Sequence, residues 1–188
     1  MRGLLLVLLL ALGGCASAPH GQPTASLSER ADAPFNLNGR LSVHHLEQRY
    51  AGGLRWQHQM RRDELLLQGP LGITAARIVS DAQSASLERN GKRYQADDVE
   101  ALMQQVLGWS LPLPVLHHWL LGEADAASPA ETERDERGRI ALLRQAGWEV
   151  RYLRYVDDSA DSLPARIALS REDMQVQLVI DEWEWNPQ

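Results

Sequence analysis

The sequence predicts a mainly β fold with some α, in which an antiparallel sheet is covered by two or three helices. Three observations predict it. Apolar and polar residues alternate from Phe35 onwards, the alternation returns after residue 140, and the apolar period becomes helical over about 97–121. Because a sheet with one apolar face must bury that face, the central helices are its available cover.

The first fourteen residues are typical of a signal peptide. Arg2 is followed by an unbroken apolar run, Leu4–Leu12, which is too short to cross a hydrocarbon core of ~30 Å. The run ends in Leu12-Gly13-Gly14-Cys15, which resembles a bacterial lipobox, so we expect Cys15 to be lipidated. The predicted organisation is a signal peptide over 1–14, a lipidated cysteine with a flexible tether over 15–34, and one folded domain over 35–188.

Composition narrows the functional classes. Cys15 is the only cysteine, so the mature chain has no disulfide and its core must hold the fold. The net charge of −6 becomes −7 once Arg2 leaves, and no basic stripe is present, so nucleic acid is not an expected partner. A polybasic membrane patch is also absent, which assigns membrane attachment to the lipid.

The first half of the domain predicts strands joined by short turns. Phe35–His44 alternates strictly, Tyr50–Gln57 repeats the pattern, and two strands are expected at Leu65–Gln68 and Ile73–Ser80. The next pair is expected at Ser84–Arg89 and Lys92–Gln95, because the Asn-Gly between them is a strong hairpin signal.

Helices are predicted in the middle of the chain. Asp97, with Glu100 three residues later, forms an acidic capping box. An apolar stripe follows at Val99, Leu102, Met103, Val106 and Leu107. Gly108 is expected to end this helix, and a second helix is expected at about Val115–Leu121.

A charged segment, Glu123–Arg139, is expected to be an exposed loop. Strands are predicted again at Ile140–Arg144, at Trp148–Tyr152, and in a last hairpin formed by Arg166–Arg171 and Met174–Ile180.

Reactive side chains do not converge in the sequence. There is no G-x-S-x-G elbow and no glycine-rich phosphate loop. His44 and His45 point to opposite faces of a strand, and His117 and His118 are badly spaced for joint ligation on a helix. We therefore expect no catalytic residue, no metal and no cofactor.

The segment Gln68–Ile73 contains an unusual turn. Pro70 and Leu71 occupy its centre, and Gly72 follows in a pattern that favours a type I turn. Leu71 at a hairpin tip is hard to bury, and such a local conflict often marks function. Alternatively, Leu71 folds back onto the core; the pattern alone leaves both options open.

One-sided strands and apolar helices also predict which side chains line a volume between the two layers. The register could shift individual members by one position. The expected wall is Leu41, Leu54, Trp56, Leu67, Leu102, Val106 and Trp119.

Several short motifs, in their order and spacing, resemble the LolB family of outer-membrane lipoprotein receptors over Phe35 to Trp183. The sequence departs from the family pattern at Gly13 of the lipobox and in the acidic loop over 123–139. The motifs are Phe35-x-Leu37-x-Gly39-Arg40-Leu41, Trp56-Gln57, Leu65-x-Leu67 with Pro70-Leu71-Gly72, Tyr94-x-Ala96-Asp97, Gly108 with Leu111-Pro112-Leu113, Trp119-Leu120-x-Gly122, Gly147-Trp148-x-Val150-x-Tyr152, Leu163-Pro164-x-Arg166-Ile167-x-Leu169 and Trp183.

The resemblance implies an incomplete antiparallel barrel of about eleven strands under a helical lid, enclosing an apolar cavity. It also implies a monomer that accepts triacylated lipoproteins from a periplasmic carrier, LolA, holds their acyl chains in this cavity, and inserts them into the outer membrane. Ala16 follows the cysteine where an inner-membrane lipoprotein would carry Asp, which favours the outer membrane, with the domain facing the periplasm.

The resemblance further implies two residue roles. The family has a protruding loop with an apolar apex at Pro70, Leu71 and Gly72, which makes Leu71 a membrane-inserting residue. Arg40 is a candidate polar contact at the barrel or lid edge, and the alternative is a solvent-facing strand arginine.

Two other functional classes remain. A structural envelope lipoprotein could bind a protein partner through its sheet, and such a scaffold would need a filled core where a carrier needs an apolar cavity. An esterase is the weaker option, because no nucleophile constellation is present.

Overall fold

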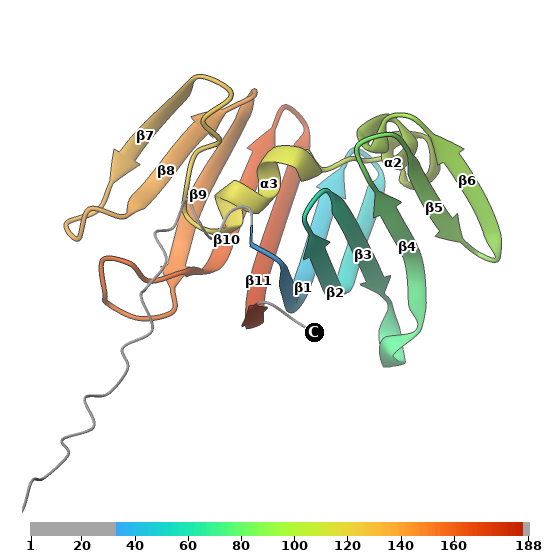
Figure 1. Cartoon of the computed structure of the whole chain (residues 1–188), viewed down its shortest axis with the longest axis horizontal. Helices are drawn as coiled ribbons and strands as arrows, with labels where there is room; N and C mark the ends of the chain where they lie inside the picture. Colours follow the sequence, from blue (N-terminus) through green and yellow to red (C-terminus); the bar gives the residue numbers. More distant parts are fainter. Residues whose placement is uncertain (1–32, 186–188) are drawn as a thin grey trace, which may run out of the picture.

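The computed structural model describes residues 33–185, so the signal peptide, Cys15 and nearly all of the tether lie outside the described residues. One antiparallel sheet curves around the helical segment (Figure 1). The elements are β1 (Phe35–His45), β2 (Gln48–Gln59), β3 (Arg62–Gln68), the 3-10 turn η1 (Pro70–Gly72), β4 (Thr74–Ser80), β5 (Ala85–Arg89), β6 (Lys92–Ala96), α2 (Val99–Leu107), α3 (Leu113–Leu120), β7 (Ala130–Arg134), β8 (Ile140–Gln145), β9 (Trp148–Tyr155), β10 (Pro164–Arg171) and β11 (Met174–Trp185).

The sheet has eleven strands in the order β6-β5-β4-β3-β2-β1-β11-β10-β9-β8-β7. Because β1 pairs with both β2 and β11, the first and last strands lie side by side at the centre. The sheet is open, with β6 and β7 at its two edges. The predicted antiparallel, incomplete barrel is confirmed.

The alternation predicted for β1 decides which face is buried. Phe35, Leu37 and Leu41 are at most 1% exposed, while the polar residues between them face outwards. Gly39 is buried on the same face, and a Cβ there would collide with the Val179 carbonyl oxygen. The β1–β11 register also shifts beside this glycine, so a close strand approach requires it.

The two helices lie where the sequence predicts them, with small differences at their starts. α2 begins one residue later than the capping box suggests, since Asp98 and not Asp97 is the cap and accepts a hydrogen bond from the Ala101 amide at 2.6 Å. It ends at Gly108, with φ of 81°. Within residues 33–185, no helix has the length and hydropathy that crossing a bilayer requires.

Part of the segment expected to be a loop is a strand. Ala130–Arg134 forms β7 and pairs with β8, although all five residues are exposed. An edge strand with neither face buried needs no apolar alternation, and charged side chains are common there because they discourage pairing with other chains. The expectation of a loop throughout Glu123–Arg139 was therefore wrong for these residues.

Strand pairing places the turns at two opposite ends of the sheet. The pairs Gly53–Gln68 and Arg77–Glu88 put the β1–β2 turn, η1 and the β5–β6 turn at one end, which we call the Leu71 end. Phe35 pairs with both His58 and Trp185, so β1 begins, β11 ends and the β2–β3 turn lies at the other end, the Phe35 end.

Candidate functional site

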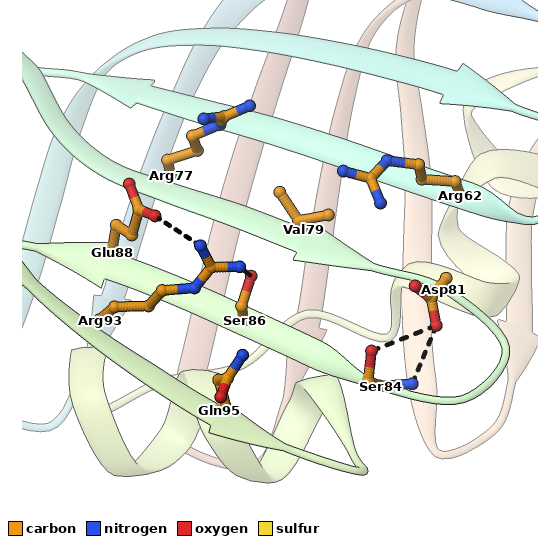
Figure 2. Close-up of a pocket in the computed structure, with 9 residues that line it drawn as sticks. All are labelled: Arg62, Arg77, Val79, Asp81, Ser84, Ser86, Glu88, Arg93 and Gln95. Carbon is orange, nitrogen blue, oxygen red and sulfur yellow. Dashed lines mark hydrogen bonds and ion pairs between the residues drawn. The ribbon is translucent and has the colours of Figure 1, made fainter.

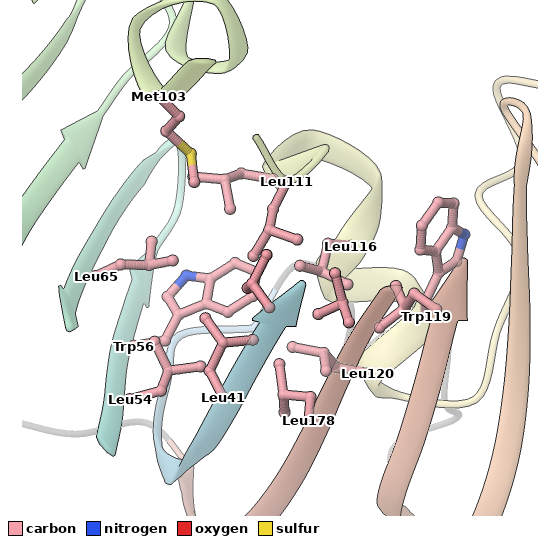
Figure 3. Close-up of a cluster of buried hydrophobic side chains, with 14 of the residues drawn as sticks. Leu41, Leu54, Trp56, Leu65, Met103, Leu111, Leu116, Trp119, Leu120 and Leu178 are labelled. Atoms are coloured by element: carbon pink, nitrogen blue, oxygen red, sulfur yellow. The ribbon is translucent and has the colours of Figure 1, made fainter. Parts of the chain in front are cut away.

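The structure brings together the seven side chains expected to line a volume. Val106 is partly buried against the cluster that the other six form, and those six are at most 2% exposed. Figure 3 shows side chains of the sheet and of α3 pointing toward one another, with Leu41 and Leu178 facing Leu116 and Leu120. The cluster members are Leu41, Leu54, Trp56, Leu67, Leu102, Val106 and Trp119. These residues pack against their neighbours as a core, and their binding of acyl chains stays a prediction.

The C-terminal end of α3 is fixed to the sheet by buried hydrogen bonds. Trp119 Nε1 donates to Gln145 Oε1 at 2.9 Å, and the Tyr152 hydroxyl donates to the Trp119 carbonyl at 2.9 Å. Gln145, which is 3% exposed, also donates to the Asp125 carbonyl at 2.6 Å. Breaking these bonds would leave buried polar groups unsatisfied, so this end of the lid is costly to lift.

The C-terminal end of α2 is held at its surface. Arg89 Nη1 donates to the Val106 carbonyl at 2.7 Å in an exposed bond. His45 Nδ1 lies 2.8 Å from the Gly108 carbonyl oxygen. Water can replace the exposed Arg89 bond at little cost. The hydrogen bonds that hold α2 are therefore more exposed than those that hold α3.

Three histidine rings stack where α3 meets β2, at the Phe35 end. The ring centroids of His58 and His117 are 5.1 Å apart, and those of His117 and His118 are 4.1 Å apart. Burial, reinforced by the neighbouring histidines, lowers the pKa of His117 from 6.5 to about 4. His117 is thus neutral near pH 7 and packs as an aromatic ring.

The stack continues into the core through Asp63 and Phe35. His58 Nδ1 lies 2.8 Å from Asp63 Oδ1, and the same oxygen accepts a hydrogen bond from Trp56 Nε1 at 2.7 Å. Phe35 stacks on His58 with centroids 5.1 Å apart. Among residues 33–185, no group of His, Cys, Asp or Glu side chains is arranged to hold a metal ion.

A pocket of about 290 Å³ lies on the outer face of β3–β6, and Figure 2 shows the side chains that line it. Its lining includes Arg62, Arg77, Asp81 and Glu88, and Val79 is its aliphatic member. Charged walls of this kind do not suit an acyl chain, because the chain would displace water from groups that it cannot hydrogen-bond. The apolar candidate site is therefore the core on the opposite face.

The turn at η1 differs from the type I turn expected from its sequence. Leu71 has φ of 59° and ψ of 19°, whereas the third position of a type I turn has φ near −90°. The Gly72 amide donates to the Gly69 carbonyl at 3.2 Å, and the Gly69 amide donates to the Ile73 carbonyl at 2.8 Å. A left-handed conformation costs a non-glycine residue roughly 1–2 kcal/mol, so the turn holds Leu71 against its local preference.

Leu71 is also 98% exposed. The alternative in which its side chain folds back onto the core is therefore excluded. Ile73 is 68% exposed, and all residues from Pro70 to Thr74 are exposed. Two large apolar side chains, Leu71 and Ile73, are thus exposed in one turn, although the sheet beside it buries its apolar side chains in the core.

Arg40 takes the solvent-facing alternative. Its Nε and Nη2 donate to the two carboxylate oxygens of Asp181 at 3.1 and 2.8 Å, on the exposed face of β1 and β11. Arg40 therefore contacts the barrel and, among the described residues, makes no polar contact with the helices. The contact thus lies at the barrel, one of the two places expected for it, and a functional role for Arg40 stays a prediction.

Sequence reasoning missed three contributors to the site. His58 and Gln145 become important through partners far along the chain, and nothing in their local sequence signals this. Ile73 did carry a signal, because it is an apolar residue directly after the exposed turn.

Comparisons with known proteins identify the family that the chain resembles. The family model described as "Outer membrane lipoprotein LolB" matches residues 33–183. The chain is 39% identical over 183 residues to the outer-membrane lipoprotein LolB of Chromobacterium violaceum, covering 97% of this chain and 98% of the relative. It is 41% identical over 177 residues to the LolB of an Azoarcus species, covering 92% and 89% of the two chains.

Solved structures support the fold. A LolA superfamily protein from Nitrosomonas europaea superimposes with a TM-score of 0.50 at 11% identity, covering 87% of this chain and 93% of the other. At such low identity the likeness concerns the fold alone. The family match and the identity over nearly the full length of the relatives together show that the chain belongs to the outer-membrane lipoprotein LolB family.

Proposed function

We propose that this chain accepts triacylated lipoproteins from a soluble, LolA-type periplasmic carrier and inserts them into the outer membrane. In this proposal the lipid on Cys15 anchors the chain, and the folded domain faces the periplasm as a monomer. No covalent step and no cofactor take part. One observation carries the proposal: in a member of this family, Leu71 is almost fully exposed in a strained turn.

The energetics of acyl chains explain why transfer needs a protein. Three chains carry about 45 methylenes, which correspond to roughly 35 kcal/mol of burial as an upper bound at ~0.8 kcal/mol each. Release into water is therefore not a route. Passage from one apolar protein interior to another keeps the chains dry, and a gradient of affinity can drive it without ATP.

The packed core supplies the apolar surface for this passage. Leu102 of α2 belongs to the same apolar cluster as the sheet residues Leu67 and Trp56, and Val106 packs against this cluster. Because α2 is held by the exposed Arg89 bond and α3 by buried ones, movement of α2 is the cheaper way to admit chains. The cargo would then replace the contacts that the helix gives up.

Delivery needs contact with the bilayer, and Leu71 supports it. A leucine side chain gains about 1.5–3 kcal/mol when it passes from water into an apolar medium, and this turn is already exposed. The test is Leu71→Glu, which should keep the fold and cargo uptake from the loaded carrier but lose delivery to liposomes. Leu71→Phe is the matched control and should deliver. A Glu variant that delivers at the normal rate would refute the role of Leu71.

A scaffold that binds a protein partner would not take up acyl chains. The discriminating measurement is uptake of a fluorescent fatty acid by residues 16–188, a fragment that contains every element in Figure 1. Val106→Asp should weaken uptake, because Val106 packs against the core cluster. Gln105→Asp, on the exposed side of the same helix, should not. Absence of uptake by the unmodified fragment would favour the scaffold.

A further inference from the structure

The β5–β6 turn lies beside the Leu71 turn. Because Arg77 pairs with Glu88, the start of β4 and the end of β5 reach the same end of the sheet. Thr74, next to the exposed Ile73, and Lys92 line one pocket of about 620 Å³ between the two turns. The two turns therefore lie next to each other at the Leu71 end of the sheet, and a surface that contacts one of them also reaches the other.

The β5–β6 turn is basic although the chain is acidic. Its five residues, Arg89–Arg93, hold three cations and no carboxylate, and Lys92 is the only lysine in a chain of net charge −6. No charged residue occurs between Gln68 and Ala76. The sequence contains no polybasic stretch, but the fold sets this basic turn, Arg89–Arg93, against an exposed apolar turn.

Some of the nearby positive charge is neutralised and some is not. Arg77 pairs with Glu64 at 2.8 Å and Arg93 with Glu88 at 3.4 Å; Figure 2 shows Arg77 and Arg93 on either side of Glu88. Within residues 33–185, Arg89 and Lys92 form no ion pair with a carboxylate, and both are exposed. Arg89 does donate to the Val106 carbonyl of α2.

We infer that the basic turn binds the phosphate groups of anionic phospholipids when Leu71 enters the bilayer. Apolar insertion combined with cations at headgroup level is the usual way in which surface segments hold an anionic membrane. An Arg89 guanidinium that turns to a headgroup phosphate loses its hydrogen bond to the Val106 carbonyl of α2. Membrane binding at Arg89 therefore also affects how α2 is held. This inference rests on the proposed delivery to membranes and adds the class of lipid that the turn recognises.

The test is sedimentation of residues 16–188 with vesicles of zwitterionic phospholipid, with or without an anionic phospholipid. Binding should be tighter to the anionic vesicles and should weaken with salt. Lys92→Gln should weaken anionic binding about fivefold and Lys92→Glu about 25-fold, since each charge near such a surface contributes a factor of about five. Lys92→Arg should bind normally, and Glu88→Gln should bind more tightly.

Arg61→Glu is the matched control, because Arg61 is also exposed but lies in the β2–β3 turn at the Phe35 end. It should bind anionic vesicles as the unmodified chain does. Equal losses for Lys92→Glu and Arg61→Glu would mean that net charge alone matters, and would overturn the inference. Competition by inorganic phosphate at constant ionic strength would also overturn it, in favour of a free-anion site.

Two further outcomes separate this inference from the proposed function. If Lys92→Glu binds vesicles normally but accepts less cargo from the carrier, the basic turn faces an acidic protein and the lipid assignment is wrong. If Leu71→Glu delivers cargo normally while Lys92→Glu still loses anionic binding, the role of Leu71 fails and the lipid contact stands.

Discussion

The two ends of the sheet differ in how they treat apolar side chains. At the Phe35 end, Phe35 and Trp56 are completely buried, and their rings meet edge to face with centroids 5.9 Å apart. At the Leu71 end, Leu71 is 98% exposed in a left-handed conformation. Apolar packing at the Phe35 end therefore stabilises the fold, and the Leu71 end can keep a backbone conformation that is locally unfavourable. Backbone strain of this kind persists where the surrounding structure imposes it, and it is concentrated at functional sites.

The largest expected effect is a loss of stability at the Phe35 end. Phe35→Ala removes a ring that packs on Trp56 and His58, and it should lower the free energy of unfolding by about 3–5 kcal/mol. Leu71→Ala should change it by less than about 0.5 kcal/mol, because an exposed side chain leaves no cavity. Urea unfolding of residues 16–188 measures both. Comparable losses would contradict the division between the two ends.

The second effect is a pH dependence located at the Phe35 end. His117 has a pKa of about 4 in the folded chain and 6.5 when unperturbed. Between these values the unfolded chain binds the extra proton, so stability is greatest above about pH 6.5 and falls as the pH drops toward 4. The full shift corresponds to roughly 3 kcal/mol as an upper limit. This net shift already includes the opposing effect of Asp63, which faces the ring along with His58 and His118.

His117→Gln removes this titration, so unfolding free energies at pH 7 and pH 5 should differ less than in the unmodified chain. The protection factors of the α3 amides, which are corrected for the intrinsic effect of pH on exchange, should fall at pH 5 in the unmodified chain but not in the variant. His44→Gln is the control, since His44 is exposed on β1. An unchanged pH dependence in His117→Gln would show that another group controls it.

Most of the fold could be predicted from the sequence, because apolar residues at buried positions recur with the period of the strand or helix that carries them. In β1 the alternation of Leu37 and Leu41 with polar residues records which face is covered, and it can be recognised without knowing what covers it. β7 escaped prediction because an edge strand that buries neither face leaves no such record. Periodicity therefore does not predict a strand that buries neither of its faces.

The site was predictable in part for the same reason. The apolar periods of α2 and of the strands identified the residues that meet in the core. A local conflict identified Leu71 as unusual but left both exposure and burial open. Its left-handed conformation was not predicted, because Pro-Leu-Gly fits more than one turn type. His58 and Gln145 could not be identified, since their partners on α3 lie 59 and 26 positions away in the chain.

A smaller effect is expected where α3 is fixed to the sheet. Tyr152→Phe removes the hydroxyl that donates to the Trp119 carbonyl. Because this carbonyl keeps its bond from the Gly122 amide, the free energy of unfolding should fall by about 0.5–1.5 kcal/mol, the net worth of one hydrogen bond. Hydrogen exchange should accelerate at the C-terminal end of α3. Tyr94→Phe, on the exposed edge strand β6, should change neither stability nor exchange. If exchange accelerates in α2 instead, the assignment of the fixed end of the lid is wrong.

The smallest effect has the opposite sign. Asn tolerates the left-handed region better than Leu does, so Leu71→Asn should raise the free energy of unfolding by about 0.5–1 kcal/mol. The same variant should lose delivery to liposomes, because an amide does not gain by entering the bilayer. Ile73→Asn is the matched control: Ile73 is also exposed, but its φ is −67°, so no strain is relieved and stability should not change. Urea unfolding and the liposome assay, applied to both variants, separate strain from insertion. If Leu71→Asn destabilises the chain, the Leu71 turn supports the fold and the two ends are not divided as described. If it stabilises the chain and still delivers, the strain at Leu71 has no connection with transfer.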